Sequence, residues 1–404
     1  MKVSLINPPS PYLSNDAAYP PSGLMYLAAA LEQLGHTVEI IDLTACIDWH
    51  KEVLDLEADI FGITCVTPNF KIVQSIAGAL PQGKPVILGG VHPTFLPEDT
   101  LNNIRCDAIV KGESEIIIRQ VMRDLEAGSL KRIYEGGLVP VEAIPKPSRH
   151  LVNLHKYHPA GEATTPVYSS RGCPFNCFFC SKVTGRTYRV LPIPRVMEEI
   201  HDVIGLGFKH VVFGDDDIAI QGGRLKELLM AMKPFKINFR LNQDSSTVDR
   251  DVIAAAADAG CTEISFGIES GSSTMLKLMN KKASVQDNKK AIEITHEFGV
   301  KVKAYFLVNF PGETEQTIKE TLRFAEDTMP DKWLLSAFAP LPGSLIFAHP
   351  EKYGITWLSS HWEDYYIVGK DGCFKPCFKT DYLSFEKQIY LHDTLYNGLK
   401  DILG

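Results

Sequence analysis

The chain has 404 residues, of which 45% are hydrophobic and 22% are charged, as expected of a globular protein with two or three domains. Its formal net charge of −8 argues against a nucleic-acid partner or an anionic membrane surface. No apolar run reaches the roughly 18 residues of a membrane span, and the first residues do not read as a signal peptide. Nine cysteines, three of them clustered, favour reduced thiols and a metal site in a cytoplasmic protein over a disulfide framework.

Residues 1–140 alternate short apolar segments with helical patterns. The first helical pattern runs from Leu24 to Leu34 and ends at Gly35. This alternation predicts an α/β domain with a doubly wound parallel sheet, whose ligands bind beyond the carboxyl ends of the strands. The expected strands are residues 3–6, 38–41, 59–64, 85–88 and 108–110.

Residues 141–164 read as a linker, because prolines interrupt every periodicity there. From residue 165 to 349 the pattern returns to repeated strand and helix units, which predicts a partial (β/α)6 TIM-type barrel that is open on one side. Active sites of such barrels lie at the carboxyl ends of the strands. The expected strands are residues 166–170, 208–213, 237–241, 263–268, 300–308 and 333–338.

Three cysteines follow the first expected barrel strand with the spacing C-x3-C-x2-C, at Cys173, Cys177 and Cys180. Thiolates are ligands of iron–sulfur clusters and of zinc. Three thiolates leave one iron of a four-iron cluster open to a substrate or cofactor. The alternatives are a zinc site completed by Cys373 or a histidine, and three reduced thiols in a loop.

With Phe179 just before its last cysteine, this motif resembles that of the radical S-adenosylmethionine (radical SAM) enzymes. The resemblance implies a [4Fe-4S] cluster whose open iron chelates SAM, and an external electron donor such as flavodoxin or ferredoxin. It also implies that SAM contacts come from the strand ends, with packing or solvated turns as the alternative readings. The expected SAM-binding residues are Phe179, Gly214, Asp215, Asn242, Gln243, Glu269 and Ser270.

Two further sets of residues are candidates for substrate contact or proton transfer. Asp216 and Asp217 follow the second barrel strand, where a solvated acidic turn is the alternative. Tyr365 and Tyr366 lie in an aromatic-rich extension, residues 350–404, which we expect to close the barrel and shape the substrate pocket. Core packing is the alternative for these tyrosines. The segment Pro311-Gly312-Glu313-Thr314 is expected to turn the chain and start a helix.

Residues 1–140 resemble the cobalamin-binding domain that precedes many radical SAM domains, on the basis of Asn7-Pro8-Pro9, Gly89-Gly90-Val91-His92 and Lys111-Gly112-Glu113. The D-x-H-x-x-G motif of classical cobalamin domains is missing. We therefore expect His92 to shape the site and not to ligate cobalt, and we expect Gly89-Gly90 to form a tight turn, a close approach to the macrocycle, or both. The expected cobalamin-binding residues are Asn7, Pro9, Thr64, Thr67, Gly89, Gly90, His92 and Glu113.

Together these resemblances imply a cobalamin-dependent radical SAM methyltransferase that acts on an unactivated carbon of a small molecule. One alternative is an enzyme of the same architecture that dehydrogenates, rearranges or cyclises its substrate, with or without bound cobalamin. Another is a cluster-bearing protein for electron transfer or sensing, which would leave SAM intact.

Overall fold

The computed structural model describes residues 1–13, 15–157, 164–369 and 372–404. The chain divides into two compact units. The first unit comprises residues 1–163 and 360–366, and the second comprises residues 164–359 and 367–404. A short piece of the expected C-terminal extension therefore belongs to the first unit. No helix of the described residues is long and apolar enough to cross a membrane.

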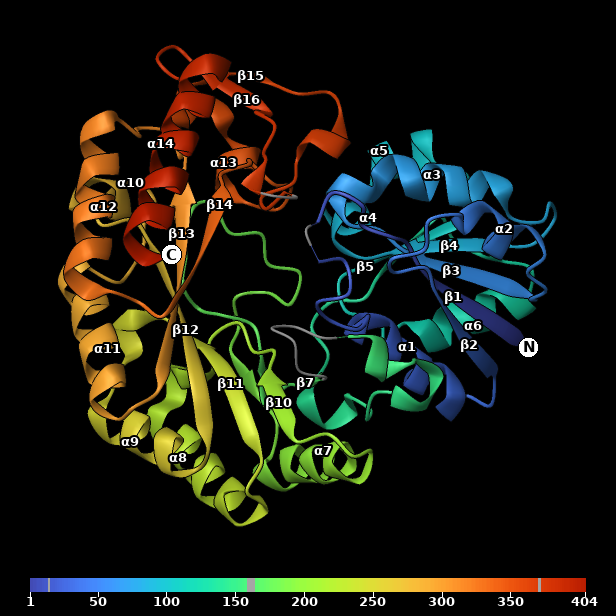
Figure 1. Ribbon diagram of the computed structural model, residues 1–404. Helices are drawn as coiled ribbons and strands as arrows, with labels where there is room; N and C mark the ends of the chain where they lie inside the picture. Colours follow the sequence, from blue (N-terminus) through green and yellow to red (C-terminus); the bar gives the residue numbers. More distant parts are fainter. Residues whose placement is uncertain (14, 158–163, 370–371) are drawn as a thin grey trace. The chain divides into compact units, whose positions relative to one another are not determined.

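The first unit is a six-stranded parallel sheet in the order β2-β1-β3-β4-β5-β6. Helices α1 and α6 lie on one face, and α2, α3 and α5 lie on the other (Figure 1). Its strands are β1 (Lys2–Asn7), β2 (Thr37–Asp42), β3 (Ile60–Thr64), β4 (Val86–Gly89), β5 (Ala108–Lys111) and β6 (Ile133–Glu135). Its helices are α1 (Ser22–Gln33), α2 (Trp49–Leu54), α3 (Phe70–Ala79), α4 (Val91–Phe95), α5 (Pro97–Asn103) and α6 (Ile118–Glu126).

Both faces of this sheet are apolar, which explains why its strands read as continuous hydrophobic runs. Leu5 and Ile87 pack under α1 and α6, whereas Ile6 and Leu88 pack under α2 and α3. This confirms the predicted doubly wound sheet. The short strand β6 was missed, because its sequence Ile-Tyr-Glu is too brief to show a pattern.

Residues 141–157, expected to be a linker, are part of the first unit. They form short 3₁₀ turns, and the backbone N–H of Ser148 donates to the carbonyl of Met25 in α1 at 3.0 Å. Tyr157 is fully buried. Residues 158–163 of the expected linker lie outside the described residues.

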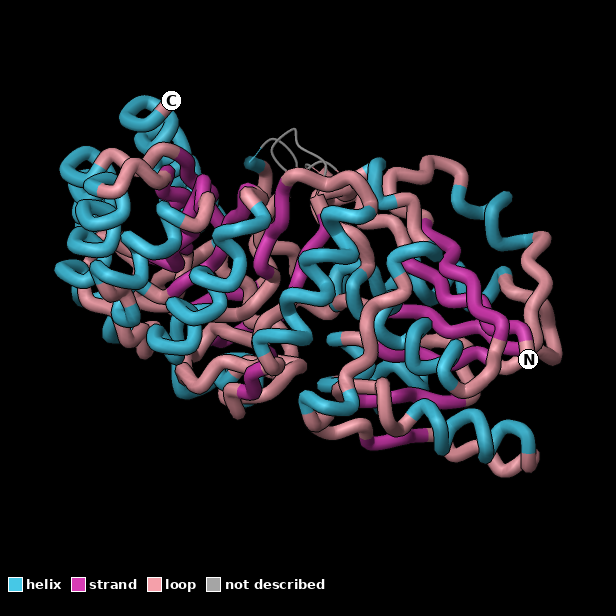
Figure 2. Tube along the Cα trace, turned by 90° about the horizontal axis from the view of Figure 1, so that it is seen from below, coloured by secondary structure: helices cyan, strands magenta, loops and turns pink. Residues whose placement is uncertain are grey.

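The second unit is also built on a six-stranded parallel sheet, in the order β14-β13-β12-β11-β10-β7. Its principal helices form the outer side of this curved sheet (Figure 1), and Figure 2 shows the strands bordered by helices. Its strands are β7 (Thr165–Val167), β8 (Ser170–Arg171), β9 (Arg189–Val190), β10 (His210–Phe213), β11 (Asn238–Gln243), β12 (Cys261–Glu269), β13 (Lys301–Val308), β14 (Lys332–Ala337), β15 (Ile355–Leu358) and β16 (Phe378–Thr380). Its helices are α7 (Ile193–Gly205), α8 (Gly222–Met232), α9 (Arg250–Asp258), α10 (Ser273–Leu278), α11 (Val285–Glu297), α12 (Glu315–Thr328), α13 (Leu345–Ala348) and α14 (Phe385–Leu403).

The first expected barrel strand, residues 166–170, is divided in the structure. β7 pairs with β10 in the main sheet, whereas β8 pairs antiparallel with β9 in a separate two-stranded sheet. Asp215 explains the division, because its carboxylate accepts hydrogen bonds from the backbone N–H and the hydroxyl of Ser169 at 3.0 and 2.8 Å. The chain is thereby turned out of the sheet just before the cysteine loop.

The segment after β13 turns the chain and starts α12, as predicted. Asn309 adopts a left-handed conformation with φ of 67°, and its amide donates to the carbonyl of Gln388 at 3.1 Å. Thr314 caps α12 by accepting from the backbone N–H of Thr317 at 3.2 Å.

Candidate functional site

The cysteine loop is held in place by hydrogen bonds to its backbone. The N–H of Phe178 donates to the carbonyl of Met279 at 3.0 Å, and the side chain of Asn280 donates to the carbonyl of Asn176 at 2.8 Å. Gly172 opens the loop with φ of 84°, and a Cβ at this position would lie 2.3 Å from the carbonyl oxygen of Thr187. The loop is therefore fixed before any ligand binds.

Cys173, Cys177 and Cys180 line one cavity of about 400 Å³ at the carboxyl ends of the strands. The predicted residues Phe179, Gly214, Asp215, Asp216, Asp217, Asn242, Gln243 and Glu269 line the same cavity. Further lining residues, which the sequence analysis did not select, are Phe175, Lys182, Asp244, Ser265, Gly267, Lys281 and Tyr305.

Lys281 is the main cation that sequence reasoning missed. Its ammonium lies 2.9 Å from the carboxylate of Asp244 and 3.4 Å from that of Glu269, and its side chain is only 7% exposed. Burial alone would lower the pKa of Lys281, but these two carboxylates hold it above its usual value. Glu269 points to the lysine from a left-handed backbone with φ of 61°, and Gly267 leaves the space that the pair occupies.

Lys182 is a second cation, two residues beyond the last cysteine, and it pairs with Asp216 at 3.3 Å. Burial raises the pKa of all three thiols, that of Cys177 to about 11. The lysines oppose this effect, since Lys182 lowers the pKa of Cys173 and Cys180 and Lys281 lowers that of Cys177. The positive charges therefore favour the thiolate form, which is the form that binds metal.

Two side chains keep buried polar atoms without a protein partner in this cavity. Gln243 is 3% exposed, yet neither its amide oxygen nor its amide nitrogen has a hydrogen-bond partner. One oxygen of Asp217 caps a short turn by accepting from the N–H of Ala219 at 3.0 Å. The other makes no hydrogen bond of ordinary geometry, although the backbone N–H of Asp244 lies near the carboxylate. Such atoms are costly unless a ligand satisfies them. Burial and the charge of Asp244 raise the pKa of Asp217 to about 7, against the hydrogen bond from Ala219.

Three other predicted contacts have a structural partner. Both oxygens of Asp215 accept hydrogen bonds from Ser169 and Ser170, so this carboxylate anchors the start of the cysteine loop. Ser270 does not line the cavity, and its hydroxyl lies 3.0 Å from that of Thr321. The ring of Phe179 packs edge-on against Phe310, with centroids 6.5 Å apart.

The predicted cobalamin residues gather at the carboxyl ends of β1, β3, β4 and β5 of the first unit. The chain leaves β1 toward β2 on one side and returns to β3 on the other, which is the switch point where such sheets bind ligands. Gly90 has φ of 100°, and a Cβ there would lie 2.8 Å from the carbonyl oxygen of Cys65. The Gly89-Gly90 pair therefore forms the expected tight turn.

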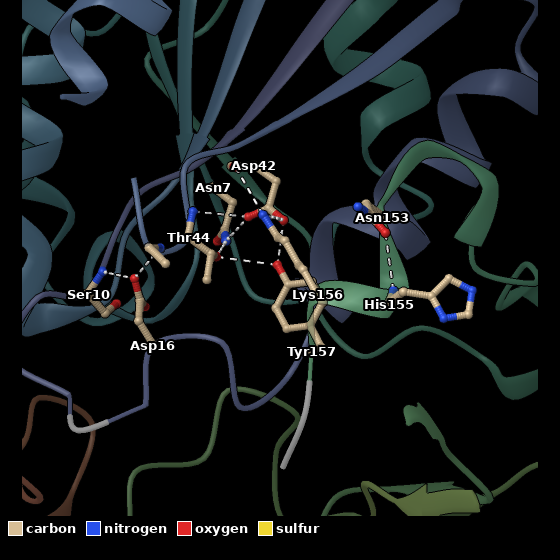
Figure 3. Close-up of polar contacts among 10 residues, drawn as sticks. Asn7, Ser10, Asp16, Asp42, Thr44, Asn153, His155, Lys156 and Tyr157 are labelled. Carbon is tan, nitrogen blue, oxygen red and sulfur yellow. Dashed lines mark hydrogen bonds and ion pairs between the residues drawn. The ribbon is translucent and has the colours of Figure 1, made fainter. Parts of the chain in front are cut away.

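The side chains of this group bond mainly to other residues of the first unit. Asn7 donates hydrogen bonds to Asp42 and Thr44 at 3.0 Å each. From the segment 141–157, Lys156 forms an ion pair with Asp42, and the hydroxyl of Tyr157 donates a hydrogen bond to it (Figure 3). Pro9 is buried and Thr64 is half-buried beside Gly90. Glu113 accepts from the backbone N–H of Val139.

His92 is fully buried at the start of α4. Its ring nitrogens lie 3.4 Å from the hydroxyl of Thr67 and 3.3 Å from the carboxylate of Asp99. Asp99 also accepts from the indole of Trp362 at 3.0 Å, and the Trp362 ring lies 5.1 Å from the imidazole. Burial lowers the pKa of His92, although Asp99 opposes the shift. Tyr365 packs against Trp362, and Tyr366 stacks on Tyr12, all within the first unit.

Residues 167–325 match the family described as the radical SAM superfamily, and residues 16–122 match the B12 binding domain. An uncharacterized methyltransferase of Pyrococcus horikoshii is 30% identical over 400 residues, which covers 91% of this chain and 87% of the relative. The anaerobic magnesium-protoporphyrin IX monomethyl ester cyclase of Cereibacter sphaeroides is 28% identical, and the match covers 82% of this chain and 60% of the cyclase. The solved structure of the radical SAM methyltransferase TsrM from Kitasatospora setae, with cobalamin and a [4Fe-4S] cluster bound, has the same fold, with a TM-score of 0.74, 16% identity, and coverage of 100% of this chain and 89% of TsrM.

Proposed function

Because the chain belongs to the radical SAM superfamily and carries a B12 binding domain, we propose that it methylates an unactivated carbon of a small-molecule substrate. Its cofactors are a [4Fe-4S] cluster, SAM and cobalamin. When bound, these groups supply reductive cleavage of SAM for hydrogen abstraction, and a carrier for the methyl group. The observation that carries the proposal is the single cavity in which three thiols meet unpartnered polar side chains.

The residues present fit a cluster with one open iron. Cys173, Cys177 and Cys180 supply three thiolates from one preformed loop, and Lys182 and Lys281 favour their charged form.

Residues that line the same cavity as the cysteines fit SAM. We assign Lys281 to the carboxylate of SAM, since it is the buried cation beside Cys177. Asp217 and Gln243 offer free acceptor and donor atoms to the amino group and the ribose hydroxyls. A Cβ on Gly214 would lie 2.5 Å from the ring of Tyr168, so this position stays bare and exposes the backbone. Phe179 is assigned to the adenine ring.

In the first unit, the proposal assigns the corrin ring to the switch point between β1 and β3. Asn7, Pro9, Thr64, Thr67, Gly89, Gly90, His92 and Glu113 are the proposed wall of this site. Because their polar groups are engaged with protein partners, they would act mainly through shape and backbone. Asp216, Tyr365 and Tyr366 stay predictions for substrate contact or proton transfer.

A second candidate function is a radical reaction without methyl transfer. The cyclase relative favours it, because that protein matches over 82% of this chain and its printed name describes ring formation. Both candidates use the cavity of the second unit, and they differ in whether SAM also serves as a methyl donor.

The proposal includes a reducing, cytoplasmic setting and an electron donor of the flavodoxin or ferredoxin type. Cys173, Cys177 and Cys180 can hold a cluster only as reduced thiols, which supports a reducing compartment. A donor is required because cleavage of SAM consumes one electron per event.

The test is anaerobic purification, followed by absorption spectroscopy with and without added hydroxocobalamin. The proposal predicts iron–sulfur absorption together with one retained cobalamin per chain. Iron–sulfur absorption without retained cobalamin would exclude the methyl-transfer function and leave the second candidate. Zinc at the three thiols would exclude both.

A further inference from the structure

The face of the second sheet that lines the cavity also carries a group of positive charges, which lie closer to the amino ends of the strands than the cavity does. Residues that are register partners in parallel strands, or two apart in one strand, point to the same face. Ser265 lines the cavity, and its register partner in β13 is Lys303, whose own partner in β14 is Lys332. Arg240 of β11 pairs in register with Glu263 of β12.

This group, here called the basic cluster, comprises Arg240, Lys303 and Lys332 around the single carboxylate of Glu263. Lys332 contacts Glu263 at 2.7 Å, and Arg240 lies 3.8 Å from it. Among the described residues, no carboxylate lies within ion-pair distance of Lys303, whose ammonium sits 5.3 Å from the ring centroid of Tyr305. One negative charge therefore faces three positive ones.

The excess charge is partly buried. The side chain of Glu263 is 5% exposed and that of Arg240 is 19% exposed, and Lys303 is half-buried, whereas the side chain of Lys332 is 44% exposed. Burial lowers the pKa of Lys303; Glu263 opposes the shift, whereas Arg240 and Lys332 add to it. Glu263 balances the charge of Lys303 only in part, because Lys332 and Arg240 share the same carboxylate.

The basic cluster lies next to the cavity on the same face of the sheet, although its own residues do not line the cavity. Tyr305, the next residue of β13 on this face after Lys303, lines the cavity itself. Two residues of a strand span about 7 Å. Lys303 lies two residues before Tyr305 in β13, toward the amino end of the strand. A substrate bound beside SAM in the cavity could therefore extend one of its groups to Lys303.

We propose that the basic cluster binds an anionic group of the substrate, a phosphate or a carboxylate. This inference rests on the proposed function and narrows its substrate class to small anionic molecules. The planar guanidinium of Arg240 suits the paired oxygens of either group, and Lys303 adds a point charge. The half-buried position of Lys303, next to the cavity-lining residue Tyr305 on the same face, fits a small anion.

The experiment measures anion binding by isothermal titration calorimetry on the full-length enzyme with oxidised cluster, cobalamin and saturating SAM, so that Lys281 is already engaged. The probes are inorganic phosphate and succinate, each titrated at constant ionic strength set with chloride. We expect saturable binding of at least one probe, and the tighter probe identifies the preferred group. Lys303→Gln should weaken that binding about tenfold or more.

Two variants make this test specific. Lys290→Gln, which removes an exposed charge from α11, should bind the probe as the unmodified enzyme does. Glu263→Gln should bind it more tightly, because the carboxylate that Arg240 and Lys332 share is gone. Equal binding by Lys303→Gln and Lys290→Gln, or no saturable binding of either probe, would overturn the inference.

This result is independent of the proposed function, because calorimetry needs no turnover. Anion binding by an enzyme that transfers no methyl group would support the basic cluster as an anion-binding site and exclude the methyltransferase function. Methyl transfer without anion binding would support the methyltransferase function and exclude the basic cluster as an anion-binding site.

Discussion

The two units place polar side chains at the carboxyl ends of their parallel strands in opposite ways. In the second unit, Gln243 and Asp217 keep buried atoms without a protein partner, beside the charged group of Lys281. In the first unit, Asn7 and His92 are bonded to neighbouring side chains. The difference indicates that the second unit is prepared for a ligand that makes many direct polar contacts. The first unit offers a shaped surface with its polar groups already satisfied.

The largest expected effect concerns the cysteines of the second unit. Cys173→Ala, Cys177→Ala or Cys180→Ala should abolish iron–sulfur absorption and reduce SAM cleavage to background, because two thiolates do not hold the cluster. The measurement is 5′-deoxyadenosine release under reducing, anaerobic conditions. Cys46→Ala, a half-buried thiol of the first unit, is the control and should retain full activity. Cleavage at the normal rate in any of the three variants would refute the cluster assignment.

Replacing Lys281 by Met should come next in size. The change leaves Asp244 and Glu269 buried without a cation, and we expect a loss of about 3–5 kcal/mol in the unfolding free energy. SAM affinity should fall as well, about tenfold or more. Urea unfolding and equilibrium dialysis with SAM measure the two effects. Lys290→Met, at an exposed lysine of α11, should change neither, and equal behaviour of the two variants would contradict the role of Lys281.

The raised pKa of Asp217 predicts a dependence of stability on pH. Between about pH 4 and 7 the folded protein keeps a proton that the unfolded chain releases, so this group makes the protein less stable as the pH rises through that window. The full effect is about 4 kcal/mol, for a pKa that rises from 3.8 to about 7. Asp217→Asn should remove it, as judged by urea unfolding of cluster-free protein at pH 5 and pH 8. Asp251→Asn, at an exposed site, should keep the dependence; the same slope in both variants would exclude Asp217 as its source.

The smallest effect tests the satisfied network of the first unit. Trp362→Phe removes the hydrogen bond from the indole to Asp99 and should cost about 1 kcal/mol. Hydrogen exchange of the amides in α4 and α5 should accelerate accordingly. Trp357→Phe, a partly exposed tryptophan of the second unit, should leave these amides unchanged. Unchanged exchange in Trp362→Phe would show that residues 360–366 do not stabilise the first unit.

Much of the fold could be predicted because apolar runs and turn residues are local signals. The parallel strands from β1 to β5 and from β10 to β14 appear as such runs in the sequence. The division between β7 and β8 could not be predicted, since it depends on Asp215 reaching back to Ser169 across 46 residues. The placement of residues 360–366 depends on contacts of Trp362 with Asp99 and His92, which no local pattern contains.

The candidate site was predictable where it follows strand ends or a cysteine motif. Lys281 was not predicted as a site residue because it lies beyond α10, and only the tertiary fold brings it between Asp244 and Glu269. Its one sequence signal is its position shortly after the segment Gly267-Ile268-Glu269-Ser270. For Asp215 the prediction of a SAM contact stays untested, although the structure shows its carboxylate engaged with two serines.

The most direct test of the central claim is the fate of SAM in the reduced, anaerobic enzyme that has been supplied with cobalamin. Both 5′-deoxyadenosine and S-adenosylhomocysteine should form, because SAM serves as radical source and as methyl donor. Formation of 5′-deoxyadenosine alone, with or without cobalamin, would contradict the methyltransferase. If neither product formed, the cavity of the second unit would not be a site of radical SAM chemistry.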